Sequence, residues 1–188
     1  SKDTFLRHLA PTSNFPVGLE VDFARGSVIT DRSGKKYIDL IAGIAVASLG
    51  HRHEGIISAV NKQMKRHSHV MVYGEYVQQS VNQLAVKLAE VLPDKLSTSY
   101  FVNSGAEANE AAVKLAKRIT GRYEVGAFQK AYQGNTMGAM SFSTNEIKKQ
   151  PFRPLIPGTR FIPFDDLRAL SQITSKTAAV IIEPIQGD

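Results

Sequence analysis

Two short apolar runs with a long alanine-rich segment between them, over residues 98–128, constrain the fold more than any other feature. The runs at 98–102 and 123–128 predict strands, and the segment that starts near Ser104 predicts a helix. Two consecutive strands joined through a helix lie parallel, because the crossover returns the chain to the same end of the sheet. The sequence therefore predicts an α/β fold with a mainly parallel sheet.

The flanking segments extend this prediction. Residues 19–40 alternate between apolar and polar positions and turn twice, which indicates short antiparallel strands. Apolar residues at spacings of three and four predict amphipathic helices over 53–70 and 75–92. The C-terminal part is expected to contain a short helix from about 134, a proline-rich loop at 148–163, a helix near 165–170 and a buried strand at 178–184.

Composition narrows the class of protein. The chain has 188 residues, of which 43% are hydrophobic and 21% charged, as is ordinary for a soluble globular protein. No apolar stretch reaches the roughly 18 residues of a membrane span, and the polar start does not resemble a secretory signal, so we expect a cytoplasmic protein. The absence of cysteine excludes disulfides, thiolate metal sites and a cysteine nucleophile.

The chain is basic, with a formal net charge of +6 and a pI near 9.5. Such a balance suits nucleic acid or small anionic ligands. Lysine and arginine are scattered, however, and the densest cluster, at 61–69, alternates with apolar residues as on a solvated helix face. The histidines at 51–53 and 67–69 lack cysteine or paired carboxylates nearby, so we expect no metal site.

Three polar groups follow the predicted parallel strands, at 103–106, 129–134 and 183–186. Ligands of open α/β sheets bind at the carboxyl edge of the strands. The start of the helix at Ser104 and Gly105 offers free backbone N–H groups and a positive dipole end, which suit a phosphate. Ser104 can also be only an N-cap, with Glu107 completing a capping box. From these residues alone the sequence indicates an anion site.

Four segments together resemble the class III aminotransferases, which depend on pyridoxal 5′-phosphate (PLP). They are DRSGKKYIDLIAGIAVASLGHRH, FVNSGAEANEAAVKLAKRITGR, AFQKAYQGNTMGAMS and IIEPIQGD, in this order along almost the whole chain. The resemblance implies the type I fold of PLP-dependent transferases, with residues 1–50 in the N-terminal segment of the small domain. Residues 51–188 would then form the first part of the large PLP-binding domain, in a homodimer with shared active sites.

The resemblance also implies roles for particular residues. Ser104, Gly105 and Ala106 would bind the cofactor phosphate, and Tyr132 would stack on the pyridine ring. Gln133 and Glu183 match positions close to the cofactor, although relatives usually carry histidine at the position of Gln133. Tyr132 could also be a core residue, and Glu183 could simply cap a loop.

Two further residues match positions that meet the substrate in this family. Ile44 lies in a stretch that lines the substrate entrance and looks most like acetylornithine aminotransferases, although it could be plain packing. Asp188 occupies the position of an acidic residue, usually glutamate, that pairs with a substrate-site arginine. Release of that arginine would let one site accept substrates of two shapes.

The implied function is transfer of an amino group from an ω-amino donor such as N-acetylornithine to 2-oxoglutarate. The lysine that holds the cofactor is expected after residue 188, so we expect no catalytic residue in this chain and treat the chain as incomplete. Alternatives are a 4-aminobutyrate or ornithine aminotransferase, or an aminomutase or racemase of the same fold. A non-catalytic fragment or a basic protein that binds nucleic acid also stays open.

Overall fold

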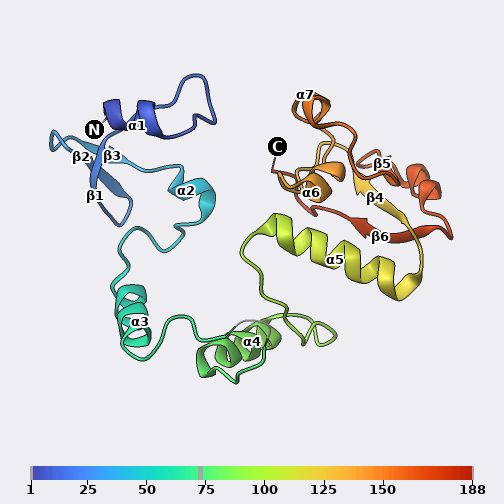
Figure 1. Cartoon of the computed structure of the whole chain (residues 1–188), viewed down its shortest axis with the longest axis horizontal. Helices are drawn as coiled ribbons and strands as arrows, with labels where there is room; N and C mark the ends of the chain where they lie inside the picture. The colour runs from blue at the N-terminus through green and yellow to red at the C-terminus, as the bar shows by residue number, and fades with distance from the viewer. Residues whose placement is uncertain (1, 72–73, 188) are drawn as a thin grey trace. The chain divides into compact units, whose positions relative to one another are not determined.

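The structure is a computed structural model that describes residues 2–71 and 74–187. The chain divides into two compact units, residues 1–79 and residues 80–188 (Figure 1). None of the helices in the described ranges is long and apolar enough to cross a membrane.

The first unit is built on a small antiparallel sheet with the strand order β1-β2-β3. The chain reverses at Gly26 and Gly34, whose positive φ angles of 56° and 87° suit glycine. This confirms the two turns and the antiparallel strands expected at 19–40. The elements of this unit are α1 (Lys2–His8), β1 (Val21–Arg25), β2 (Val28–Asp31), β3 (Lys36–Ile38), α2 (Ala42–Ala45) and α3 (Glu54–Met64).

Asp39 joins the end of this sheet to the turn that follows it. Its carboxylate accepts the N–H groups of Ile41 and Ala42 at 3.0 and 2.9 Å, and lies 2.7 Å from Nε2 of His51. The hydrogen bond with His51, followed by that with Ala42, lowers the pKa of Asp39 below its ordinary value. His51 therefore has a structural hydrogen-bonding partner.

The second unit is built on a parallel sheet with the order β5-β4-β6. Helix α5 packs against β6 and α6 (Figure 1). Helix α4 (Gln79–Val91) crosses the division between the units. The elements that follow it are α5 (Gly105–Thr120), β4 (Glu124–Phe128), α6 (Met137–Ser141), α7 (Glu146–Lys149), the 3₁₀ helix η1 (Gln150–Phe152), β5 (Thr159–Ile162), the 3₁₀ helix η2 (Leu167–Gln172) and β6 (Thr177–Ile181).

The core of the second unit lies on both faces of β4, whose five residues are all buried. Successive side chains of a strand point to opposite faces. Val125 and Ala127 accordingly pack with Val113 of α5 and with Phe142, whereas Phe128 packs with Ile162 and Ala169 on the other face. Covered on both faces, β4 holds the loop that follows it in a fixed place.

Three details differ from the sequence predictions. Residues 98–102 form no strand, since in the described part of the chain they do not pair with β4, β5 or β6. The proline-rich loop at 148–163 contains β5, whose four residues follow the last turn-forming glycine, Gly158. The helix expected near 165–170 is the 3₁₀ helix η2, capped by the Asp166 side chain.

Helix and strand ends also shift. Helix α3 ends at Met64 rather than near residue 70, and α4 begins at Gln79 rather than near residue 75. Strand β6 is half-buried rather than buried on both faces, because it lies at an edge of the described sheet. The parallel direction of β4 and β6 and the helix over Gly105–Thr120 agree with the prediction.

Candidate active site

The N-terminus of α5 presents backbone N–H groups at the carboxyl edge of the parallel sheet. Ser104 is the N-cap, and its Oγ accepts the N–H of Glu107 at 3.2 Å, while the Glu107 carboxylate accepts the N–H of Asn103 at 2.7 Å. The prediction that Ser104 is the N-cap is therefore confirmed, whereas Glu107 binds the N–H of Asn103 rather than that of Ser104. Within the described part of the chain, no hydrogen bond uses the N–H groups of Gly105 and Ala106. The cap orders the helix end and leaves these two donors available.

The space beside Gly105 is open. A Cβ atom built on Gly105 would meet no atom within 4 Å, so nothing in the described chain fills the approach to the helix end. The absence of a side chain there lets an anion come close to the free N–H groups. The arrangement fits a phosphate group.

The loop after β4 packs directly on the same helix end. A Cβ on Gly134 would lie 2.6 Å from the Cβ of Ala106 and 3.0 Å from its Cα, and Gly134 has a φ of 127°. Only glycine fits this close approach of loop to helix. Gly134 therefore places Tyr132 and Gln133, which precede it, next to the N-terminus of α5.

Glu183, which follows β6, holds the loop from the other side. Its Oε1 accepts the backbone N–H of Tyr132 at 2.9 Å and Nε2 of Gln133 at 3.3 Å. Hydrogen bonds thus join Tyr132 and Gln133 to Glu183, although Glu183 lies about fifty positions further along the chain. Tyr132 as a whole residue is 49% exposed, so its ring can pack on a flat ligand.

Gln133 lies inside the protein, with 6% of its surface exposed. Its backbone N–H donates to Ser143 Oγ at 2.9 Å, and Asn109 Nδ2 donates to its backbone and side-chain oxygens at 2.8 and 3.2 Å. Gln133 therefore connects α5, the loop after β4, and Glu183. This burial gives it a positioning role in the described chain.

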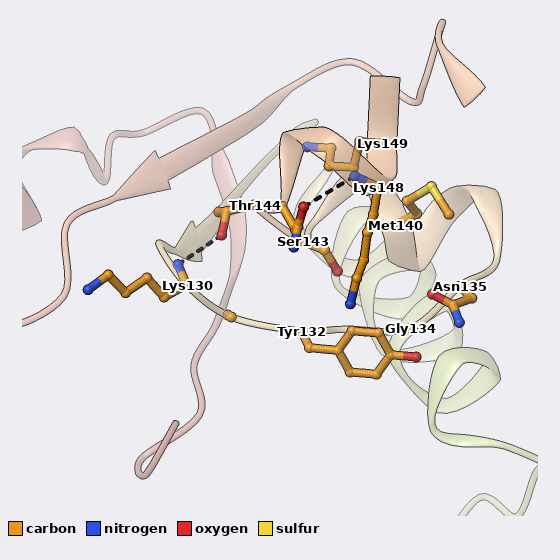
Figure 2. A pocket seen from close by; sticks show the side chains of 11 residues that line it. Lys130, Tyr132, Gly134, Asn135, Met140, Ser143, Thr144, Lys148 and Lys149 are labelled. Atoms are coloured by element: carbon orange, nitrogen blue, oxygen red, sulfur yellow. Dashed lines mark hydrogen bonds between the residues drawn. The ribbon is translucent and has the colours of Figure 1, made fainter. Parts of the chain in front are cut away.

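A pocket of about 340 Å³ opens beside Tyr132 at the same edge of the sheet. Figure 2 shows the Lys148 side chain extending toward the Tyr132 ring, whereas Lys130 extends away from it. The remaining wall combines polar and apolar side chains, including Asn135, Met140, Ser143 and Thr144. A cavity of this size and mixture suits a small organic ligand.

The other predicted substrate residues are not part of this cluster. Ile44 lies in the first unit, is 86% exposed and has a left-handed φ of 62°. Asp188 lies outside the described residues. Among residues 2–71 and 74–187, no group of three or more histidine, aspartate or glutamate side chains could hold a metal ion.

Sequence reasoning missed Asn109, Ser143 and Lys148. Asn109 gave a weak signal, because an amide side chain inside an alanine-rich helix usually has a partner. Ser143 and Lys148 gave none, since their neighbours become apparent only once the loop after β4 and α7 are folded together.

Comparison with known sequences identifies the family. The profile of the family Aminotransferase class-III matches residues 10–188. An acetylornithine aminotransferase from Methanopyrus kandleri is 40% identical over 182 residues, which are 96% of this chain and 46% of that enzyme. A [LysW]-aminoadipate semialdehyde/glutamate semialdehyde transaminase from Sulfurisphaera tokodaii is 37% identical over 172 residues, 91% of this chain and 44% of that enzyme.

Solved structures agree in fold. An ω-transaminase from Thermomicrobium roseum, described as (S)-enantioselective, superposes with a TM-score of 0.86 at 26% identity, over 98% of this chain and 49% of that one. The ornithine aminotransferase of Toxoplasma gondii, described with partial occupancy of PLP at its active site, gives a TM-score of 0.81 at 27% identity, over 100% of this chain and 46% of that one. The chain thus spans about half the length of these relatives. The type I fold of PLP-dependent aminotransferases is confirmed, and the chain belongs to the class III aminotransferase family, whose cofactor is PLP.

Proposed function

We propose that the full-length protein is a PLP-dependent aminotransferase that moves an amino group from an ω-amino donor, such as N-acetylornithine, to 2-oxoglutarate. The observation that carries the proposal is the meeting of three features at one sheet edge: the free N–H groups of α5, the exposed Tyr132 ring and the Glu183 carboxylate. They belong to a chain whose family is class III.

The residues present fit the cofactor. Its phosphate would lie against the unused N–H groups of Gly105 and Ala106, where the space is open and the helix dipole is positive. The Ser104 hydroxyl, which accepts one N–H in the cap, keeps its own O–H to donate. Tyr132 would cover one face of the ring.

PLP supplies an electron-accepting ring that stabilises negative charge at the carbon losing a proton. The residues of this chain would hold that ring. Tyr132 would pack on its face, and Glu183 fixes Tyr132 through the backbone N–H bond at 2.9 Å. Gln133 stays close to the cofactor through this network, as a buried support rather than a group that touches the ring.

Support for the donor comes from relatives. Acetylornithine aminotransferases from Corynebacterium efficiens and Listeria monocytogenes are 42% and 38% identical, over 44% and 46% of those enzymes. A second candidate substrate is an aminoadipate or glutamate semialdehyde, or the amine formed from it, because the Sulfurisphaera tokodaii transaminase named above is 37% identical. Ile44 would line the substrate entrance. 4-Aminobutyrate and ornithine are further members of the same donor class.

We also propose a cytoplasmic homodimer, with a small domain that contains residues 1–50 and a large domain that begins at 51. Large exposed apolar side chains such as Phe15 and Ile185, each 90% exposed, support burial against further chain or a partner. The lysine that holds the cofactor would lie after residue 188. Borohydride reduction of the full-length protein followed by peptide mapping tests this, and a labelled lysine within residues 1–188 would contradict it.

The function is tested by incubating the full-length protein with PLP, 2-oxoglutarate and N-acetylornithine, and measuring glutamate. We expect glutamate to form in proportion to enzyme. Ornithine and 4-aminobutyrate are assayed in parallel to rank the donors. Absence of glutamate with every donor, in protein that is folded and loaded with PLP, would overturn the proposal.

A further inference from the structure

The pocket beside Tyr132 is positively charged. Lys130, Lys148 and Lys149 line it, and among the described residues no acidic side chain does. Lys149 is 3% exposed, and its Nζ lies 3.4 Å from the Glu146 carboxylate and 4.5 Å from the centre of the Phe161 ring. Its charge is therefore used inside the protein.

The other two lysines differ in direction. The Lys130 side chain extends away from the pocket, while Lys148 extends across it toward the Tyr132 ring (Figure 2). Glu146, the nearest acidic residue in sequence, is engaged by Lys149 and by Arg153. In the described part of the chain, no carboxylate lies within 4.0 Å of the Lys148 ammonium group. Lys148 is thus the cation that the pocket offers to a ligand.

The pocket also offers neutral polar groups. Asn135 has an exposed amide on the rim, and the Ser143 hydroxyl, which accepts the Gln133 N–H at 2.9 Å, retains a proton to donate. Met140 and Ala131 supply apolar surface. One ammonium group with one or two neutral donors matches a carboxylate, whereas a dianionic phosphate calls for the several N–H donors found at α5.

We propose that Lys148 binds the carboxylate of the amino acid or 2-oxo acid substrate, with the Tyr132 ring as the opposite wall. This inference rests on the proposed aminotransferase function. Lys148 is a specificity-determining residue here, because its charge selects substrates that carry a carboxylate. Glu146 pairs with Lys149 and Arg153, so among the described residues Lys148 is the cation that extends into this pocket without an acidic neighbour within 4.0 Å.

The test compares two donors that differ only in the carboxylate, N-acetylornithine and N-acetylputrescine, with the full-length enzyme. For Lys148→Ala we expect KM for N-acetylornithine to rise about tenfold or more, because a charge-assisted hydrogen bond is lost. KM for N-acetylputrescine should stay within about twofold. Lys148→Arg should restore most of the affinity for N-acetylornithine.

Lys130→Ala is the matched control, since Lys130 lines the same pocket but its side chain points away. It should change neither KM. An equal rise of KM for both donors with Lys148→Ala, or no rise for either, would overturn the proposal. Reduction with borohydride that labels Lys148 itself would also overturn it, because the residue would then hold the cofactor.

If the wild type shows no turnover, the proposed function is wrong, but carboxylate binding by Lys148 can still be tested. Isothermal titration of PLP-loaded wild type and Lys148→Ala with glutarate, a dicarboxylate, then decides. Affinity about tenfold weaker in Lys148→Ala supports the carboxylate site. Equal affinity, or no binding to the wild type, contradicts it.

Discussion

At the residue scale, Gln133 shows how the site is held. Its side chain is buried and satisfied on both ends, by Asn109 and by Glu183, and its backbone is bound by Ser143. A glutamine side chain can donate and accept at once, so Gln133 satisfies both of these neighbours. These contacts fix the position of Tyr132, which precedes Gln133 in the same loop.

Replacement of Gln133 tests this support. Gln133→Leu leaves the amide of Asn109 with one acceptor fewer and Glu183 with one donor fewer, so we expect the free energy of unfolding to fall by about 2 kcal/mol. Denaturant titration of the full-length protein measures it. Gln129→Leu, at an exposed position whose described contact is a backbone one, should change it by less than about 0.5 kcal/mol. Equal effects of the two substitutions would contradict the role of Gln133.

Gly134 sets the distance between loop and helix. Gly134→Ala would place a Cβ 2.6 Å from the Cβ of Ala106, and the backbone of α5 cannot easily move to relieve this clash. We therefore expect a loss of about 2 kcal/mol or more in unfolding free energy. Gly187→Ala, where an added Cβ meets nothing within 4 Å, is the control and should be near neutral. Wild-type stability and wild-type PLP affinity in Gly134→Ala would show that this contact is not required.

At the element scale, β4 organises the second unit. It begins with Glu124, a buried carboxylate that accepts from Arg160 of β5 at 2.7 and 2.9 Å, and it ends in the loop that carries Tyr132. The hydrogen bonds from Arg160 are the main cause that lowers the pKa of Glu124. The ion pair thus ties β4 to β5 at the end of the strand opposite the site.

The direction of the pKa shift of Glu124 determines how the stability that this ion pair contributes depends on pH. Because the pKa of Glu124 is lower in the folded than in the unfolded protein, its stabilisation is present above the unfolded pKa of about 4.3 and is lost as pH falls through the folded pKa. The difference in stability between wild type and Glu124→Gln should therefore be constant from about pH 5 to 8 and shrink below about pH 4. Urea titrations at each pH measure it, and a difference that grows on acidification would contradict the account.

Helices and strands were predicted correctly where the local sequence signals and the expected burial favoured the same element. Helix α5 has a cap, an alanine-rich body and Gly121 at its C-terminal end, and β4 is apolar enough to be central. Prediction failed where strand pairing determines the structure. Residues 98–102 have strand-forming side chains but no partner strand in the described chain, and β5 lies within a proline-rich segment that was predicted as a loop. The sheet edge of the site was predictable, but Asn109, Ser143 and Lys148 depend on folded neighbours.

At the scale of the whole molecule, the chain spans 46% of the Methanopyrus kandleri enzyme, so groups outside it would complete the site. Asp188 is expected to pair with an arginine from that further part. Asp188→Ala in the full-length protein should then slow the half-reaction with the ω-amino donor more than that with 2-oxoglutarate, because the freed arginine favours the second carboxylate. Single-turnover kinetics of each half-reaction measure this, and equal slowing of both would exclude the pairing.

The central claim is that the N-terminus of α5 binds the phosphate of PLP. A titration of the full-length protein with PLP, followed by its absorbance, tests it on Gly105→Val against wild type. A valine side chain would occupy the open space at Gly105, so we expect the Kd for PLP to rise about tenfold or more while the unfolding free energy of the unloaded protein changes little. Ala112→Val, at an exposed position further along α5, should leave the Kd unchanged. A Kd for Gly105→Val equal to that of the wild type would place the phosphate elsewhere and contradict the account.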